Sequence, residues 1–323
     1  MVNLPALSVV IPVHNEADNV VPLCERLDAV LDAYQPDAEI IIVDDGSTDA
    51  TFATLKGLRG RFPRLRIIRF TRNYGQTPAL AAGFDHARAP VIVALDGDLQ
   101  FHPEDLPLVV DKLAEGYDLV NGWRDRSHDP ATRSLPSRLA NAMMRYVTGI
   151  PMHDFGSTFK AYRRDLLENL HLYGELHRFI PALASRYGAR MVEVPVRWSP
   201  RLHGKSHYGL GRTWRVFLDM IAVKFLIAYS AKPLRVFGSL GIACLGLGGV
   251  LWLITLLMKL PALGGYSITG NPLLFLGVML VLAGVQFITN GLLAEMLTRT
   301  YYEGSKVRTI YTIREVVEDD SLP

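Results

Sequence analysis

Short apolar runs alternate with longer helix-like segments over about the first two hundred residues of the chain. The apolar runs are rich in β-branched residues, and each of the first four precedes a segment whose apolar positions have helical spacing. They read LSVVIPV, EIIIVDD, RIIRF, VIVAL and DLVNGW. Strands that alternate with helices in this way form a mostly parallel sheet with helices on both faces. The pattern therefore predicts an α/β fold.

Two long stretches near the C-terminal end, Val236–Met258 and Pro272–Ala294, carry no formal charge. Each is long enough to cross a hydrocarbon core of roughly 30 Å as a helix. We expect two transmembrane helices, because the alternative, buried helices of a soluble core, rarely stays uncharged over such a length. Basic residues flank the outer ends of the pair, namely Lys232, Arg235, Arg299, Lys306 and Arg308. By the positive-inside rule, both ends of the pair face the cytoplasm and the connecting loop faces out.

A third segment, Gly211–Ser230, precedes these stretches and has apolar residues at helical spacing. Its charged residues lie mostly between the apolar positions. This pattern is typical of an amphipathic helix in the membrane interface. Ordinary packing of a domain against the membrane would give a similar pattern.

Net charge and cysteine content narrow the class of protein. The formal net charge is +2 over 323 residues, so the chain has no strong overall positive charge that would attract nucleic acid. Cys24 and Cys244 are far apart in the sequence, which argues against a disulfide framework and fits a reducing compartment. The N-terminus has no basic segment followed by a long apolar core, so we expect no signal peptide.

Polar residues stand at the end of each of the first four apolar runs. They are Asn15, Glu16, Asp44, Asp45, Asn73, Gln76, Asp96 and Asp98. The carboxyl ends of parallel strands meet at one edge of a sheet, and open α/β sheets bind their ligands there. The sequence therefore predicts one polar pocket at this edge.

The stretch ALDGDLQFHPED, residues 94–105, carries two acids one residue apart after the fourth apolar run. Asp96 and Asp98 flank the small Gly97, so both carboxylates can grip one hard divalent cation. Such a cation keeps several waters, takes further ligands from substrate phosphates and neutralises a departing diphosphate. An isolated D-x-D motif is equally typical of a turn, but its place at the end of a buried strand favours a metal site.

Two windows without an acidic residue offer basic side chains to an anionic ligand. In residues 130–153, Arg133, Ser137 and Asn141 recur every four positions and would share one helix face. That face suits a phosphate, although a solvated helix has the same pattern. Residues 194–218 hold a second basic set, Arg197, Arg201, Lys205, Arg212 and Arg215. This set would also suit anionic lipid, at about 1 kcal/mol per basic residue.

Taken in order, the polar motifs resemble the GT-A glycosyltransferases of family 2. The resemblance rests on PVHNE, IIVDDGSTDAT, RNYGQTPALAAG and LDGDLQFHPEDL. Later motifs are similar to the polyprenyl-phosphate branch of that family, which includes dolichyl-phosphate mannose synthase and bacterial undecaprenyl-phosphate sugar transferases. They read NGWRDR, RSLPSRLAN, DFGSTFKAYRR, GELHRFIP and VPVRWSPRLHGKSHYG. The resemblance covers nearly the whole chain and implies a GT-A domain, with a Rossmann-like and mostly parallel sheet, followed by two transmembrane helices.

The resemblance implies a donor site for a nucleotide sugar, UDP-linked in preference to GDP-linked. The implied donor-binding residues are Pro12, Asn15, Glu16, Asp45, Asp96, Gln100, Arg201 and Lys205. Among them, Asp45 would contact the nucleotide base. Arg201 and Lys205 lie in RLHGKSHYG and would close over the pyrophosphate.

The resemblance also implies a catalytic set consisting of Asp96, Asp98, Arg124, Arg133 and Ser137. The two aspartates, together with Gln100, would hold Mg²⁺ or Mn²⁺ on the diphosphate. Arg124 and Arg133, supported by Ser137, would clamp the acceptor phosphate. Asp154 and Glu175 would bind the sugar or serve the structure rather than abstract a proton.

The implied reaction is the inverting transfer of a sugar from the nucleotide to the phosphate of a polyprenyl phosphate. A monoester phosphate has a second pKa of about 6, so near neutral pH it needs positioning more than deprotonation. One alternative is a glycolipid synthase with a lipid hydroxyl acceptor, which would need a base such as Asp154. Another is a non-catalytic scaffold that binds nucleotide sugars. A processive polysaccharide synthase is disfavoured, because Val194 stands where the Q-x-x-R-W motif requires Gln.

The expected organisation has four parts. Residues 1–210 form the cytoplasmic GT-A domain, 211–232 the interface helix, 233–298 the transmembrane hairpin and 299–323 a cytoplasmic tail. The chain would be a multi-pass protein of the inner membrane whose termini and catalytic domain are cytoplasmic. Its expected partners are a nucleotide-sugar donor, a polyprenyl phosphate and the membrane, without nucleic acid. A homotetramer is preferred among the oligomeric states left open.

Overall fold

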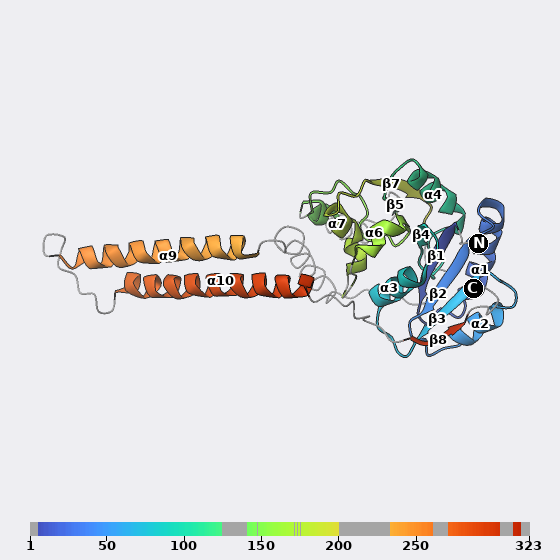
Figure 1. Ribbon diagram of the computed structural model, residues 1–323, viewed down its shortest axis with the longest axis horizontal. Coiled ribbons are helices and arrows are strands. Elements are labelled where there is room, and N and C mark those ends of the chain that lie inside the picture. The colour runs from blue at the N-terminus through green and yellow to red at the C-terminus, as the bar shows by residue number, and fades with distance from the viewer. Residues whose placement is uncertain are drawn as a thin grey trace. The chain divides into compact units, whose positions relative to one another are not determined.

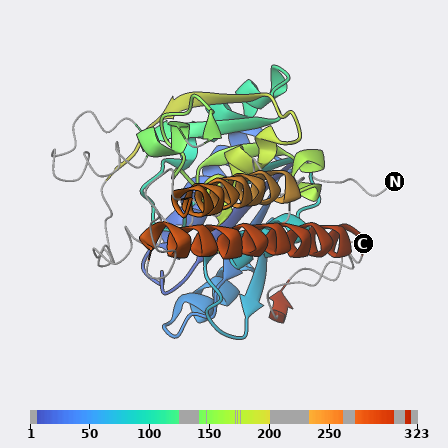
Figure 2. The same ribbon diagram turned by 90° about the vertical axis from the view of Figure 1, so that its left-hand side faces the viewer.

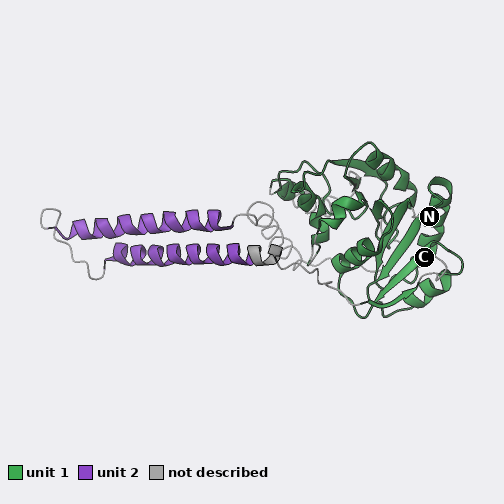
Figure 3. Ribbon diagram, in the orientation of Figure 1, with its two compact units in different colours: residues 1–223, 309–323 green, residues 224–308 purple. Residues whose placement is uncertain are grey.

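The chain folds into two compact units, which are coloured separately in Figure 3. A computed structural model describes residues 6–124, 141–146, 148–170, 172, 174, 176–199, 233–260, 271–303 and 313–317. The first unit comprises Met1–Val223 with Thr309–Pro323, and the second comprises Lys224–Arg308. The expected interface helix, residues 211–232, lies outside the described residues.

The first unit is built around one mixed sheet with the strand order β7-β5-β6-β4-β1-β2-β3-β8 (Figure 1). Its strands are β1 (Leu7–Val13), β2 (Glu39–Asp44), β3 (Leu65–Phe70), β4 (Val91–Ala94), β5 (Leu119–Arg124), β6 (Lys160–Arg163), β7 (Met191–Val196) and β8 (Ile313–Val317). Only β6 and β8 run against the other described strands. The predicted mostly parallel α/β sheet is confirmed.

Helices cover both faces of this sheet (Figure 1). They are α1 (Val20–Tyr34), α2 (Thr51–Leu58), α3 (Gln76–His86), η1 (Pro103–Asp105), α4 (Leu106–Ala114), α6 (Arg164–Glu168), η2 (Leu176–Phe179) and α7 (Ile180–Ser185). Alternate strand residues such as Val9 and Ile11 pack in one cluster with α1, α2 and α4. Their neighbour Val10 is also fully buried, and α3 packs against β1 and β2. Because side chains alternate across a strand, burial on both faces explains the near-continuous apolar runs.

The strand directions bring the expected polar residues to one edge. Strands β1, β2, β3 and β4 all run in the same direction. Strand β5 also runs in this direction, because both β4 and β5 are antiparallel to β6. The carboxyl ends of all five strands, and of β7, therefore share one edge of the sheet. The chain also enters β6 at that edge.

The outermost strand comes from the C-terminal end of the chain. Residues 313–317 form β8, which pairs antiparallel with β3 and carries an ion pair of 2.8 Å from Glu315 to Lys56. The sequence predicts only a tail over 299–323, whereas β8 completes the sheet of the first unit. The chain thus leaves this domain after β7 and returns to it after the apolar hairpin.

The second unit contains two long helices, α9 (Pro233–Met258) and α10 (Pro272–Glu303), which lie side by side (Figure 2). Both are long and apolar enough to span a membrane, as the sequence predicts. Little of either helix is buried, whereas the core helix of a soluble protein is mostly buried. The α10 helix continues to Glu303, five residues beyond the boundary expected at 298.

Glycines spaced seven residues apart bring α9 and α10 together. A Cβ atom on Gly284 would lie 2.8 Å from the carbonyl oxygen of Gly241, and one on Gly277 would lie 3.2 Å from that of Gly248. On α10 the series continues to Gly291, whose Cβ would lie 2.9 Å from Cβ of Phe237. Small residues of this kind allow the backbones of membrane helices to approach closely.

Candidate functional site

Asp45 follows β2 and holds the turn that leads into α3. Its two carboxylate oxygens accept hydrogen bonds from the backbone N–H groups of Tyr74, at 2.6 Å, and Gly75, at 2.8 Å. Gly75 has a φ of 100°, a conformation that favours glycine. Burial raises the pKa of Asp45, and the two backbone hydrogen bonds oppose this shift. The expected base-binding carboxylate therefore also connects the ends of β2 and β3.

The loop after β1 is attached to the loop after β2. Asn15 has a left-handed backbone, with a φ of 56°, and its side-chain oxygen accepts the N–H of Thr48 at 2.9 Å. Its own backbone N–H donates to the Ser47 hydroxyl at 2.9 Å. The N–H of Glu16 donates in the same way to Thr51. These bonds place Asn15 and Glu16 beside the Asp45 turn, whereas Pro12 is half-buried within β1.

The D-x-D motif directly follows β4 at the shared edge. Gly97 packs against β1, since a Cβ atom there would lie 2.6 Å from a Val13 methyl group. This contact gives a physical reason for glycine between the two acids. Asp98 is only 5% exposed, and Leu99 adopts a φ of 58° in the turn that follows.

Two side chains form hydrogen bonds with Asp96. Gln76, at the start of α3, donates to its carboxylate at 2.8 Å, and the Thr158 hydroxyl also bonds to it. Burial and the negative charge of Asp98 raise the pKa of Asp96 to about 6, and the positive charges of Arg124 and Lys160 partly offset this shift. The carboxylates of Asp96 and Asp98 therefore repel each other in the metal-free protein.

A divalent cation fits this pair of acids. The described residues contain no cluster of three or more His, Cys, Asp and Glu side chains that would enclose a metal. Mg²⁺ and Mn²⁺ do not require such a cage, because one or two carboxylates, waters and substrate phosphates complete their coordination. A bound cation would also relieve the repulsion that raises the pKa of Asp96.

Gln100 connects the D-x-D motif to the chain that follows β7. Its backbone N–H donates to Asp98 at 3.2 Å, and its side-chain amide donates to the carbonyl oxygen of Ser199 at 3.4 Å. The N–H of Ser199 donates to the Gln100 carbonyl at 2.8 Å. The hydroxyl of Ser199 also meets Nε2 of His102 at 2.8 Å. Arg201 therefore comes two residues after Ser199, which is attached to the residues that follow the D-x-D motif.

Arg124 and Asp154, expected in different roles, form one ion pair. Nε and one terminal nitrogen of Arg124 donate to the two carboxylate oxygens of Asp154 at 2.5 and 2.8 Å. Asp154 is 4% exposed, so its charge needs this partner. The guanidinium also lies 5.6 Å from the ring centroid of Phe101, which follows the D-x-D motif. Asp154 therefore orients Arg124 at the edge of the sheet.

Two charged residues of this edge were not singled out from the sequence. Lys160 begins β6, is fully buried, and has a pKa lowered to about 8 because burial disfavours its charged form. Glu193 in β7 accepts hydrogen bonds from Asn121 and from the backbone N–H of Asp154. The available signal for Glu193 was a single acid inside the apolar strand β7, since buried charges require partners.

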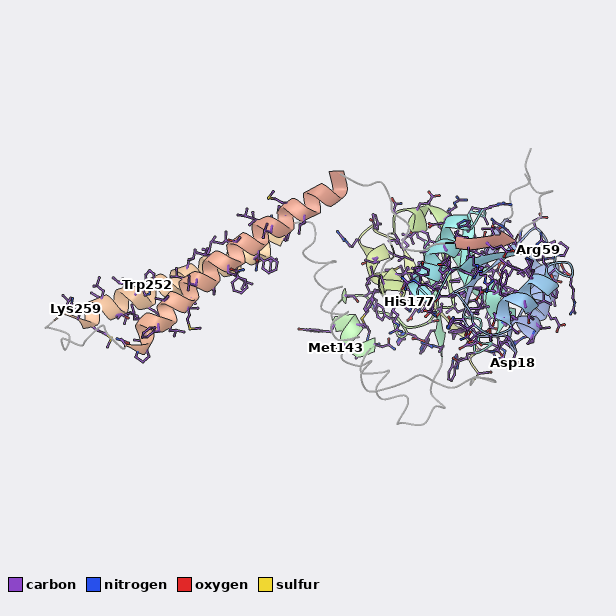
Figure 4. The ribbon with its side chains drawn as sticks, turned by 90° about the horizontal axis from the view of Figure 1, so that it is seen from below. Asp18, Arg59, Met143, His177, Trp252 and Lys259 are labelled. Carbon is purple, nitrogen blue, oxygen red and sulfur yellow. The ribbon has the colours of Figure 1, made fainter. Side chains whose placement is uncertain are left out.

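Five of the expected site residues lie outside the described residues: Arg133, Ser137, Glu175, Arg201 and Lys205. Their roles remain predictions. Among the described neighbours, His177 of η2 is labelled in Figure 4. Its Nδ1 meets the Thr77 hydroxyl at 2.7 Å and so attaches η2 to the start of α3, where Gln76 reaches Asp96.

Sequence comparisons match residues 8–170 to the family model described as glycosyl transferase family 2. The dodecaprenyl-phosphate galacturonate synthase of Rhizobium johnstonii is 42% identical over 321 residues, which cover 98% of this chain and 94% of that protein. The undecaprenyl-phosphate 4-deoxy-4-formamido-L-arabinose transferase of Edwardsiella ictaluri is 36% identical over 313 residues, covering 96% of this chain and 94% of that protein.

Comparison with solved structures finds the same fold in glucosyl-3-phosphoglycerate synthase from Mycobacterium tuberculosis. Its complex with phosphoglyceric acid has a TM-score of 0.53 at 21% identity and covers 68% of this chain and 79% of that chain. A complex of the same enzyme with Mn²⁺, UDP and glucosyl-3-phosphoglycerate has a TM-score of 0.52 at 22% identity, with the same coverage. At this identity the likeness concerns the fold alone.

Proposed function

Because the chain belongs to glycosyl transferase family 2, we propose that it transfers a sugar from a nucleotide sugar to the phosphate of a polyprenyl phosphate. Two relatives named as polyprenyl-phosphate sugar transferases match it almost from end to end. The observation that carries the proposal is structural. The D-x-D motif, the Asp45 turn and the Arg124–Asp154 pair share one sheet edge, in a chain that also has two membrane-length helices.

The donor we propose is a UDP-sugar, and the sugar is galacturonic acid. This choice follows the relative with 42% identity, which is named for galacturonate, over the one with 36% identity, which is named for formamido-arabinose. Asp45, Asn15, Glu16 and Pro12 would form the base pocket. Their support is the set of hydrogen bonds that joins the loops after β1, β2 and β3.

A divalent cation, Mg²⁺ or Mn²⁺, would be held by Asp96 and Asp98 together with Gln100. When bound, it supplies positive charge to the leaving diphosphate. The crowding of the two carboxylates supports this assignment, as does the presence of Mn²⁺ and UDP in a crystal structure of the same fold. Arg201 and Lys205 would close over the same diphosphate, because the segment before them is attached to Gln100 through Ser199.

The acceptor phosphate would be bound by Arg124, with Arg133 and Ser137 completing the clamp. In the reaction, a phosphate oxygen attacks the anomeric carbon while the bond from that carbon to the diphosphate breaks. The configuration inverts, and the nucleoside diphosphate leaves. No proton has to be removed, because a monoester phosphate is already largely ionised at neutral pH. Both oxygens of Asp154 accept hydrogen bonds from Arg124, which supports a positioning role for Asp154 rather than the role of a base.

The site would work on the cytoplasmic face of the inner membrane, with the chain crossing twice. The chain leaves the GT-A sheet after β7 and re-enters it as β8, so the two outer ends of a spanning hairpin must be on the side of this domain. The basic residues that flank the hairpin favour the cytoplasm as that side. A homotetramer remains our preferred assembly.

A donor panel tests this function. The full chain in detergent is incubated with undecaprenyl phosphate, Mg²⁺ or Mn²⁺ and one donor at a time: UDP-galacturonate, UDP-4-deoxy-4-formamido-L-arabinose, UDP-glucose or GDP-mannose. We expect UDP release and a lipid of the mass of undecaprenyl phosphate galacturonate with the first donor. The same lipid product with another donor alone would refute only the choice of sugar. Absence of any polyprenyl phosphosugar would refute the function.

A further inference from the structure

One acidic side chain at the site edge uses all of its acceptor capacity to arrange its neighbours. Oε1 of Glu193 accepts Nδ2 of Asn121 at 2.9 Å and the N–H of Asp154 at 3.1 Å. Oε2 accepts both the N–H and the Nδ1 of His153, at 2.7 and 2.9 Å. A carboxylate has about four lone-pair sites, so Glu193 is saturated. It therefore does not bind substrate itself but fixes residues 153 and 154.

The His153 ring is held on two sides. Its Nδ1 faces a carboxylate that can only accept, so Nδ1 carries a proton in either charge state of the ring. The ring also stacks on Trp123, with centroids 4.6 Å apart and planes 23° apart. Nevertheless, the His153 side chain is 60% exposed, whereas that of Glu193 is 10% exposed. The nitrogen left to face a ligand is thus Nε2, on the far side of the ring from Nδ1.

This imidazole belongs to the site edge by its connections. Trp123 directly precedes Arg124 at the end of β5, and His153 directly precedes Asp154, the partner of Arg124. The charge of Arg124 in turn reaches Asp96 of the D-x-D motif. His153 is exposed but rigidly held, and it directly precedes Asp154, the counter-ion of Arg124. An isolated surface histidine would not need contacts that order its ring in this way. A ring oriented by a carboxylate is a common way to aim its second nitrogen at a ligand.

We propose that His153 is a further binding residue: with both ring nitrogens protonated, its Nε2–H donates a hydrogen bond to an anionic oxygen of the substrate, and Glu193 is its positioning residue. The inference rests on the proposed function and adds a contact to it. Two substrate groups have the required chemistry, the acceptor phosphate and the carboxylate of a uronic acid. Both present charged oxygens that strengthen a hydrogen bond from a ring nitrogen.

Four variants of the full chain test the proposal. His153→Phe retains a ring that can stack on Trp123 but has no nitrogen, whereas His153→Gln offers an amide N–H in a similar place. Glu193→Gln removes acceptor capacity that the His153 ring needs. Glu168→Gln is the matched control, because Glu168 is 63% exposed in a surface pair with Arg164 on α6. The chain reaches α6 by running along β6 away from the site edge.

The first readout is the dissociation constant for undecaprenyl phosphate, expressed as a mole fraction in mixed micelles, which requires no turnover. The second is the dissociation constant for UDP-galacturonate, compared with those for UDP-galactose and UDP. If the ligand is the acceptor phosphate, we expect His153→Phe to weaken binding of the lipid phosphate roughly tenfold, the loss of one charge-assisted hydrogen bond. If the ligand is the uronate, only UDP-galacturonate should lose affinity.

In either case, His153→Gln should recover part of the loss, Glu193→Gln should weaken the same ligand, and Glu168→Gln should change nothing. Unchanged affinity of His153→Phe for both anionic ligands would overturn the proposal. So would equal weakening of UDP, UDP-galactose and UDP-galacturonate, or a fall in thermal stability without a change in affinity. Failure of the wild-type chain to form any polyprenyl phosphosugar would refute the proposed function, whereas these binding constants would still decide the role of His153.

Discussion

At the residue scale, the pair of acids after β4 combines a raised pKa with a place at the shared edge of the sheet. Asp96 has a pKa raised to about 6 by burial and by Asp98, so its ionised form is disfavoured in the metal-free protein. A raised folded-state pKa stabilises the fold fully below the unfolded value, near 4, and this stabilisation is lost as the pH rises through about 6. A cation bound by both acids should reverse the loss.

Mn²⁺ should therefore raise the melting temperature more at pH 7.5 than at pH 5, where protons compete with the metal for Asp96. The measurement is thermal unfolding of the full chain in detergent, with and without Mn²⁺. The variant Asp96→Asn should lose most of this pH-dependent gain, whereas Asp165→Asn, an exposed change, should keep it. An equal Mn²⁺ effect in Asp96→Asn would exclude Asp96 as a ligand.

The rate of sugar transfer should also depend on the carboxylate of Asp98. Replacement by Asn removes a charge that would hold the cation on the diphosphate, and we expect the rate of transfer to fall about a hundredfold or more. Lipid-linked sugar formed per minute at saturating donor measures the effect. A variant within twofold of the wild type would show that the D-x-D motif serves only as a turn.

The ion pair between Arg124 and Asp154 gives a second prediction. In Asp154→Asn, Arg124 keeps its charge but loses its counter-ion, so the protein should be destabilised by ~1–3 kcal/mol. The affinity for the lipid phosphate should fall because Arg124 is no longer oriented, while the affinity for UDP should stay the same. Urea unfolding and ligand titrations measure these effects, with Asp165→Asn, 81% exposed at its side chain, as control. Loss of UDP affinity instead would move Asp154 to the donor site.

Some of these residues could be identified from the sequence and others could not. Asp96 and Asp98 are recognisable because the motif stands at the end of a buried run. The sequence reading also names Asp154 as a candidate, but its partner could not be foreseen, because Arg124 lies thirty positions away. Glu193 and Lys160 are single charges in short strands. Only the fold reveals that one accepts four hydrogen bonds and that the other is fully buried.

At the element scale, the glycines of α9 and α10 decide how closely these helices approach. Gly248 lies where a Cβ would be 2.9 Å from the carbonyl oxygen of Gly277, whereas Gly246 has no atom within 4 Å of such a Cβ. Gly248→Leu should therefore separate the helices and destabilise the hairpin by ~1–3 kcal/mol, the usual cost of overpacking. Gly246→Leu should leave the stability of the hairpin unchanged.

Thermal unfolding in detergent compares the two glycine variants directly. Equal melting temperatures for Gly248→Leu and the wild type would contradict the helix pairing. From the sequence, both glycines belong to one small-residue-rich stretch, and nothing in the composition separates them. What distinguishes Gly248 from Gly246 is its place in the seven-residue spacing, which matches the positions of Gly277, Gly284 and Gly291 on the partner helix.

At the scale of the whole molecule, the path of the chain constrains its topology in the membrane. The hairpin is inserted between β7 and β8 of one sheet, so the proposed crossing of the membrane would return both of its outer ends to the same side. The short strand β8 could not be found from the sequence, because its five residues join β3 from more than two hundred positions away. The sequence does predict the same topology independently, through its basic flanks.

Cysteine labelling tests this topology. A membrane-impermeant maleimide should label Ser267→Cys, which stands between α9 and α10 in the sequence, in intact spheroplasts. It should label Ser305→Cys, beyond α10, only after the membrane is opened. The unsubstituted chain controls for Cys24, which is buried, and for Cys244, which is within α9. Labelling of both positions from outside would contradict a hairpin with cytoplasmic ends.

The central claim is that the nucleophile is a lipid phosphate. The most direct measurement is transfer of labelled galacturonate from UDP-galacturonate to undecaprenyl phosphate or to undecaprenol, which differ only in the phosphate. With the full chain and Mn²⁺, we expect a labelled lipid only from undecaprenyl phosphate, with release of one UDP for each sugar transferred. Labelled product from undecaprenol, or from neither lipid while another hydroxyl lipid is glycosylated, would contradict the phosphate as acceptor.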